Sequence, residues 1–253
     1  MGESPVNCKE IMKELSVSES ISQGWELAKK HGLLLALFVL VIGIVMSLLN
    51  SLALPSGFME EYANVLQGGD PESLQRMVTQ MSVGSTVISV IQVVIEVFFL
   101  AGFSATILKL ARGIMEKVSL EGFKISAMTY LKYFAVAIIV GLIVGIGTFL
   151  CIIPGIFFAV RLAFADWYIL DHPEAGIGEA ISASWKMTKG NFWSVFGLLL
   201  SEVGIILLGY LCCCIGVLFA VPFACFAESC AYMTLHENLA TAAPVNEYVQ
   251  DER

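Results

Sequence analysis

The chain has 253 residues, of which 57% are hydrophobic and 14% are charged, and its mean hydropathy is +0.81. Soluble domains carry about 25% charged residues, so this composition argues against an ordinary soluble protein. The formal net charge of −8 offers no basic surface for nucleic acid, and we expect no nucleic-acid partner. The apolar residues fall into long uninterrupted runs, a pattern that indicates helices spanning a membrane.

Residues 1–32 are predicted to form a cytoplasmic segment that ends in an amphipathic helix. The segment is polar and mixed in charge, with no apolar core before a small-residue cleavage site, so we expect no cleaved signal peptide. Ser16 and Glu19 match a capping box, in which the two side chains satisfy free amides at a helix start. The helix is expected to run through Trp25 and to stop at Gly32, after cations in its last turn.

Six apolar runs after this segment are long enough to be spans. They cover residues 33–54, 83–110, 133–152, 156–170, 192–210 and 216–235. Gly141, Gly145 and Gly147 in the third run allow close helix approach, and Pro154–Gly155 is expected to break the chain before the fourth. The sequence therefore predicts an all-α integral membrane protein, with residues 1–253 as one membrane domain.

The polar segments between and after the spans have distinct expected roles. Residues 55–82 form an outer loop, in which Asp70 and Glu72 flank the start of a short helix. Residues 236–253 form a polar cytoplasmic tail, which we expect to be mobile.

The basic residues predict the orientation. With six spans, twelve of the 14 lysines and arginines fall on the side of both termini, and the opposite loops hold only Arg76. Basic residues concentrate in cytoplasmic loops. We therefore expect a multi-pass protein of the cytoplasmic membrane with its N-terminus and C-terminus inside the cell.

Two stretches of the chain resemble each other at an offset of 160 residues. Both Ser18–Leu40 and Gly178–Leu200 read as a short amphipathic helix leading into a span. Six positions are identical, namely Glu19/Glu179, Ile21/Ile181, Ser22/Ser182, Trp25/Trp185, Lys29/Lys189 and Leu40/Leu200. Trp prefers the headgroup level and Lys the aqueous side, so Trp25, Trp185 and Lys189 are predicted to mark interfacial helices. We favour a structural role for them over lipid sensing or partner binding.

Two further comparisons suggest a repeat of helix hairpins. A looser copy of the amphipathic helix covers Ser119–Phe134, and an offset of 62 residues aligns Pro154–Leu170 with the sixth span. That second alignment pairs Asp166 with Glu228. The chain would then consist of three units, each made of a surface helix, a span, a short turn and a second span.

The region around residues 150–200 carries a more specific pattern. It contains a Pro-Gly turn at Pro154–Gly155, then Arg161 in the following span, and then an Ala-x-x-x-Ser-Trp-x-x-Thr-x-Gly helix, formed by Ala180, Ser184, Trp185, Thr188 and Gly190. This pattern resembles a large uncharacterised family of polytopic bacterial and archaeal membrane proteins, which includes the membrane domain attached to some glycerophosphodiester phosphodiesterases. The resemblance implies a fold and a membrane location. It implies no phosphodiesterase activity, because the chain contains no phosphodiesterase domain.

Ionisable residues inside the spans are the first candidates for function, since each costs about 2.5–3.5 kcal/mol at mid-span. The set comprises Arg161, Glu96, Glu202 and Glu228, with Asp166 nearer the inner boundary. In one interpretation, Arg161 binds an anionic headgroup or solute in a polar cavity, and the acids relay protons or bind cations. In the other, Arg161 pairs with a carboxylate and locks the hairpins together, while the remaining acids are protonated or reach toward the interface.

Other chemistry has little support in the sequence. Most of the seven cysteines lie in apolar runs, and Cys212, Cys213 and Cys214 point about 100° apart on a helix, so they cannot clasp one metal ion. His31, His172 and His236 fall at predicted helix ends, where interfacial capping is the simpler interpretation. No HExxH, GxSxG or P-loop motif is present. We expect no enzyme activity, no cofactor and no metal site.

Two functions remain open at this point. The first is a non-catalytic protein that binds or moves a lipid or small solute through a polar site between helices. The second is a scaffold or assembly protein whose surface helices engage other membrane proteins or further copies of itself. Membrane lipids are expected partners in both.

Overall fold

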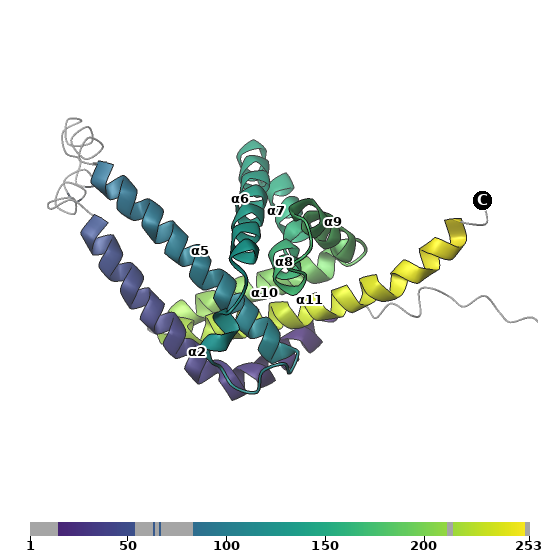
Figure 1. Cartoon of the computed structure of the whole chain (residues 1–253), viewed down its shortest axis with the longest axis horizontal. Coiled ribbons are helices and arrows are strands. Elements are labelled where there is room, and N and C mark those ends of the chain that lie inside the picture. The colour runs from purple at the N-terminus through teal and green to yellow at the C-terminus, as the bar shows by residue number, and fades with distance from the viewer. Residues whose placement is uncertain (1–14, 54–62, 64–65, 67–82, 212–214, 251–253) are drawn as a thin grey trace, which may run out of the picture. The chain divides into compact units, whose positions relative to one another are not determined.

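The computed structural model describes residues 15–53, 63, 66, 83–211 and 215–250, and helices are the only regular structure in them (Figure 1). The helices are α2 (Val17–Ala53), α5 (Val83–Ala111), the 3₁₀ turn η1 (Leu120–Phe123), α6 (Ala127–Leu150), α7 (Ile152–Leu162), α8 (Ala165–Asp171), α9 (Ile177–Thr188), α10 (Phe192–Leu211) and α11 (Ile215–Gln250). The predicted all-α class is therefore confirmed.

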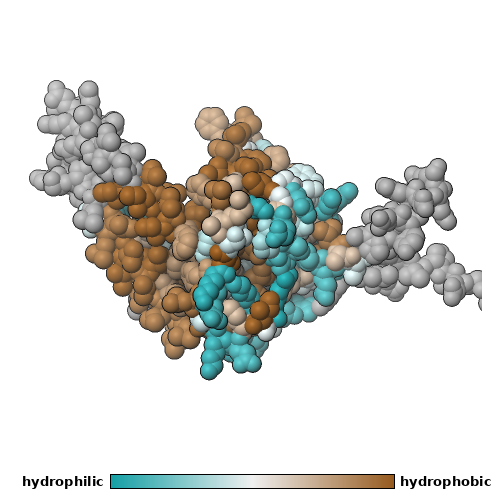
Figure 2. All heavy atoms as spheres, in the orientation of Figure 1, coloured by the Kyte–Doolittle hydropathy of each residue, from teal (hydrophilic) through white to brown (hydrophobic). Residues whose placement is uncertain are grey.

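Six candidate spans are found among the described residues, as predicted. They cover Val17–Ser51, Ile88–Ala111, Ala127–Leu150, Ile152–Asp171, Phe192–Leu211 and Gly216–Thr241. Large apolar side chains on them face outward, among them Leu142, Ile146 and Phe149 of α6. Figure 2 shows that hydrophobic residues cover broad areas of the surface and that hydrophilic residues gather in other areas. Surfaces of this size call for a nonaqueous environment, so the chain is a multi-pass membrane protein.

The contacts group the chain into two units. Unit 1 comprises Met1–Ala36 and Ala101–Arg253, and unit 2 comprises Leu37–Leu100. Within unit 1, α6 packs on α7, and α10 packs on α11 (Figure 1). The sites described below lie in unit 1.

The N-terminal helix does not stop at Gly32. The amphipathic segment and the first span form one continuous helix, α2, which runs through this glycine without a break. A glycine inside a helix costs only about 1 kcal/mol relative to alanine, and burial of His31 and Leu35 on either side offsets that cost. At the helix start, the Ser16 hydroxyl accepts a hydrogen bond from the backbone N–H of Glu19, as one half of the expected capping box requires.

The connector between the second and third spans is not a third surface helix. Instead of the expected copy at Ser119–Phe134, it contains the single turn η1 and then the start of α6, capped by Ser126. Two glycines explain the turn, because they let it press against α5. A Cβ on Gly102 would lie 2.1 Å from the Phe123 ring, and a Cβ on Gly122 would lie 2.1 Å from Oγ1 of Thr106.

The turn between the third and fourth spans lies at Cys151, in extended conformation, rather than at Pro154–Gly155. Pro154 fits into the first turn of α7, where no intrahelical N–H is needed. The close approach of α6 and α7 rests on Gly147 and Gly155. A Cβ on Gly155 would lie 2.1 Å from Oγ1 of Thr148 and 2.8 Å from its backbone.

Two other expectations concern the ends of the polar segments. The segment expected as a mobile tail continues as α11 as far as Gln250. The outer loop, with its short helix at Asp70, and the cysteines 212–214 lie outside the described residues, apart from Ala63 and Leu66.

The α6–α7 contact predicts a position-specific effect of adding one methyl group. Gly155→Ala should lower the unfolding temperature in detergent, since overpacking of this kind costs about 1–3 kcal/mol. Gly145→Ala is the matched control, because its added Cβ meets nothing within 4 Å. Equal unfolding temperatures for the two variants, measured by thermal scanning, would contradict the packing described here.

Candidate functional site

The fourth span is broken, and the break organises the site. Helix α7 ends at Leu162 and α8 begins at Ala165, which frees backbone groups between them. The hydroxyl of Ser184 in α9 donates to the carbonyl of Arg161 at 2.9 Å and accepts from the N–H of Phe164 at 3.2 Å. Thr188 donates to the same carbonyl at 3.4 Å. The hydroxyls of α9 thus replace hydrogen bonds that the broken helix cannot make.

Helix α9 is held in place along its length. At its start, the Glu179 carboxylate accepts from the N–H of Gly176 and from the hydroxyl of Tyr168. Its buried face consists of Ala180, Ala183, Ser184, Met187 and Thr188. Lys186 and Lys189 are exposed, as is Trp185 in part. The small and hydroxylated residues of the sequence pattern therefore face the break, and the bases face away from it.

Arg161 lies in an aromatic cage, which we define as Phe157, Trp185 and Phe192. The guanidinium carbon is 5.3 Å from the ring centres of Phe157 and Trp185 and 5.7 Å from that of Phe192. Phe157 also packs edge to face with Trp185 at 5.8 Å. The cage draws one residue from each of α7, α9 and α10, so it exists only in the folded protein.

Among the described residues, no carboxylate pairs with the guanidinium. Its Nε and Nη1 are buried without a hydrogen-bond acceptor, and no ion pair of Arg161 is found in the described part of the chain. The carboxylate pairing considered from the sequence is thus absent there. Phe192 is the first residue of α10 and Glu202 lies ten residues further on, a separation of about 15 Å along a helix.

Three of the predicted acids do lie near one another. Asp166 of α8, Glu202 of α10 and Glu228 of α11 are close enough for their charges to interact. Glu202 is only 9% exposed, and its Oε1 has no hydrogen-bond partner. Glu228 is within hydrogen-bonding reach of Trp167. We call these three residues the carboxyl cluster.

Glu96 belongs to unit 2, and its side chain is exposed. The sequence could not separate Glu96 from the other acids, because all four stand in similar apolar runs.

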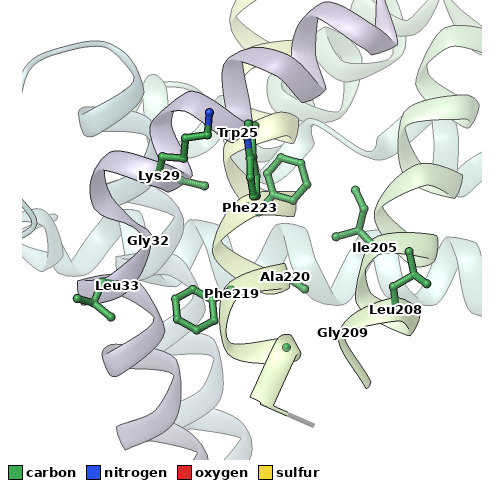
Figure 3. A pocket seen from close by; sticks show the side chains of 12 residues that line it. Trp25, Lys29, Gly32, Leu33, Ile205, Leu208, Gly209, Phe219, Ala220 and Phe223 are labelled. Carbon is green, nitrogen blue, oxygen red and sulfur yellow. The ribbon is translucent and has the colours of Figure 1, made fainter. Parts of the chain in front are cut away.

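A groove that the sequence analysis did not anticipate lies between α2, α10 and α11 (Figure 3). Its volume is about 640 Å³, and its lining is mostly apolar, with Lys29 as the charged residue of the lining. Trp25 lies at one side of the groove. Its ring packs edge to face with that of Phe223, with 5.5 Å between the ring centres, and the Lys29 ammonium is 5.4 Å from the Trp25 ring centre. The Trp25–Lys29 spacing was visible in the sequence, whereas the facing residues of α10 and α11 come from tertiary packing.

Comparison with known proteins adds no assignment. No family model, curated protein or solved structure matches the chain. The resemblance of residues 150–200 to a family of polytopic membrane proteins stays a prediction.

The hydroxyl of Ser184 should matter far more than that of its neighbour in α9. Ser184→Ala leaves the Phe164 N–H and the Arg161 carbonyl short of a buried partner, at a cost of about 1–3 kcal/mol. The exposed Ser182, replaced by Ala, is the control. We expect thermal unfolding in detergent to show a lower midpoint for Ser184→Ala alone, and a similar midpoint for both variants would contradict the role of Ser184.

Proposed function

We propose that this multi-pass protein is a non-catalytic lipid-binding protein that holds the anionic headgroup of a membrane lipid at Arg161. The observation that carries the proposal is the guanidinium enclosed by three aromatic rings, with buried donors that have no acceptor. A permanent charge in such surroundings is costly unless it is paired. An anion from outside the chain would supply the missing partner.

A phosphate headgroup suits this arrangement. The guanidinium is planar and presents donors in a fork that matches phosphate oxygens, and the three rings around it restrict its position. The cage therefore orients the group before a ligand arrives. Pre-orientation of this kind lowers the entropy lost on binding.

The position of Arg161 supports a lipid rather than a solute carried through the middle of the protein. The cage includes Phe192, at the end of a candidate span, and Trp185 in a helix that exposes Lys186 and Lys189. Trp and Lys favour the headgroup region of a bilayer. The charge distribution of the whole sequence supports a cytoplasmic position for this end, with both termini inside the cell.

The groove supports the same function through the hydrocarbon part of a lipid. Its apolar lining fits an acyl chain. Lys29, the charged residue of the lining, already pairs with the exposed Glu26 at 2.8 Å, so the acyl chain carries this contact. The groove and the cage contact different parts of α10, namely Ile205–Gly209 and Phe192, so we treat them as separate lipid contacts.

The test of the cage compares lipid selectivity between charge variants. Native mass spectrometry of the purified protein with equal amounts of phosphatidylglycerol and phosphatidylcholine should show a preference for the anionic lipid. Arg161→Gln should reduce that preference about tenfold or more, since a hydrogen bond to a charged group contributes about 1.5–3 kcal/mol. Arg161→Lys should retain part of it, because the charge remains and the fork is lost.

Lys124→Gln is the control for this test, because it removes the same charge from an exposed residue of the connector. Water-soluble glycerol phosphate as a competitor separates recognition of the headgroup alone from recognition of the whole lipid. An unchanged preference for the anionic lipid in folded Arg161→Gln would contradict the proposal. A wild type that selects no lipid but co-purifies as an assembly with itself or another membrane protein would favour the scaffold function.

Filling the groove should remove a bound lipid without harming the fold. A Cβ on Gly32 meets only Ala28, at 4.0 Å, so Gly32→Leu places its side chain in the groove with little strain. Gly43→Leu, in open surroundings on the same helix, is the control. We expect one fewer retained lipid for Gly32→Leu in native mass spectra. Equal lipid counts for the two variants would contradict occupation of the groove by an acyl chain.

A further inference from the structure

Three side chains with metal-binding chemistry meet where α8 ends. Asp171 is the last residue of α8, His172 follows it, and His236 comes from α11. One ligand atom from each of the three lies within 4.8 Å of the other two. Nδ1 of His172 is 3.5 Å from Oδ2 of Asp171, and the two imidazole ring centres are 4.9 Å apart.

The free nitrogen of His172 points to a missing ligand. Its Nδ1 is buried and has no hydrogen-bond partner. The 3.5 Å separation from Asp171 is too long for a good hydrogen bond. It is close to one edge of a tetrahedral zinc site, which is about 3.4 Å when the metal–nitrogen and metal–oxygen bonds are about 2.0–2.2 Å. The three ligand atoms lie within 4.8 Å of one another, so they would have to approach by up to about 1.4 Å to reach that spacing.

The surrounding residues hold these groups in place. Both terminal nitrogens of Arg112 bond to the Asp171 carboxylate, and the Tyr232 hydroxyl donates to Oδ2 at 2.8 Å. Tyr168 stacks on His172 at 4.5 Å, and Tyr232 stacks on His236 at 5.6 Å. Outer partners of this kind orient the ligands in metal sites of proteins.

We infer that Asp171, His172 and His236 bind a divalent first-row transition metal such as Zn²⁺, with water as a further ligand. Two imidazoles and one carboxylate are a donor set that Zn²⁺ accepts, and imidazole also suits its first-row neighbours. Arg112 offsets the negative charge of Asp171, so the imidazoles supply most of the affinity. The inference is independent of lipid binding, because no residue of the cage or the groove takes part.

Such an ion would clamp α8 to α11. His236 belongs to α11 and His172 directly follows α8. Asp171, the last residue of α8, already bonds to Tyr232 of α11 and to Arg112, just beyond α5. A ligand that binds only the folded state stabilises it. Metal binding should therefore raise the unfolding temperature of the protein.

The experiment uses the full chain in detergent, stripped of metal by a chelator and then desalted. Titration with Co²⁺ should give the visible absorption of a nitrogen- and oxygen-ligated ion, saturating at one equivalent per chain, and Zn²⁺ should displace it. His172→Gln and His236→Gln should each weaken binding by about tenfold or more, as loss of even an outer partner does in known sites. Unfolding temperatures with and without Zn²⁺ provide a second readout.

His31→Gln is the matched control, because His31 lies against Phe226, and none of its atoms is in this cluster. The control should bind Co²⁺ and gain stability with Zn²⁺ as the wild type does. The rise in unfolding temperature on adding Zn²⁺ is measured within each variant, so the comparison is informative even for a variant that is less stable without metal. A wild type that binds no stoichiometric Co²⁺ would overturn the inference. Equal losses of binding in His31→Gln and His172→Gln would overturn it as well.

Discussion

The interaction on which the rest of unit 1 depends is the pair of hydrogen bonds from Ser184 to the broken fourth span. Phe164 and Ser184 are fully buried, so no water reaches the freed N–H and carbonyl, and an unsatisfied buried group costs about 1–3 kcal/mol. The Ser184 hydroxyl serves one group of each kind, at Phe164 and Arg161. A break at this point is stable only with α9 beside it, which explains why α9 is buried along one face and fastened at its start by Glu179.

The same contact determines the surroundings of Arg161. Trp185 is the neighbour of Ser184 in α9, so the hydrogen bonds that close the break also place the indole against the guanidinium. Contacts between a cation and aromatic rings are worth about 0.5–2 kcal/mol, which is less than a buried charge needs. Glu202 cannot make up the difference, because it stands at the middle of α10 and the cage at its end.

Hydropathy was enough to predict the number of spans, because long apolar runs leave few alternatives. It failed where tertiary contacts decide the backbone. Gly32 looked like a helix stop, yet its buried neighbours keep α2 continuous, and Ser119–Phe134 looked amphipathic, yet the contact of Gly122 with Thr106 calls for a single tight turn. The sequence indicates where helices begin and end only through the helix propensity of each residue. Packing against residues of other helices outweighs this propensity.

The candidate site was predictable in its chemistry and not in its grouping. Rare ionisable residues stand out in apolar runs, so Arg161 and the acids were easy to find. Which of them meet depends on how the helices pack, and this is why the grouping of Asp166, Glu202 and Glu228 could not be predicted. Phe157 and Arg161 are four residues apart, and residues at this spacing share one face of a helix. The spacing was therefore a usable signal for part of the cage. Trp185 and Phe192 complete the cage only through the fold.

Helix α11 has 36 residues, which corresponds to about 54 Å at the usual rise per residue. The hydrocarbon core of a bilayer is about 30 Å thick, and even a strongly tilted helix needs only about 40 Å to cross it. Several turns of α11 must therefore stand in water on one side of the membrane. This projecting part continues, as one helix, the span that carries Glu228 and His236. A label attached there would report the tilt and rotation of that span directly.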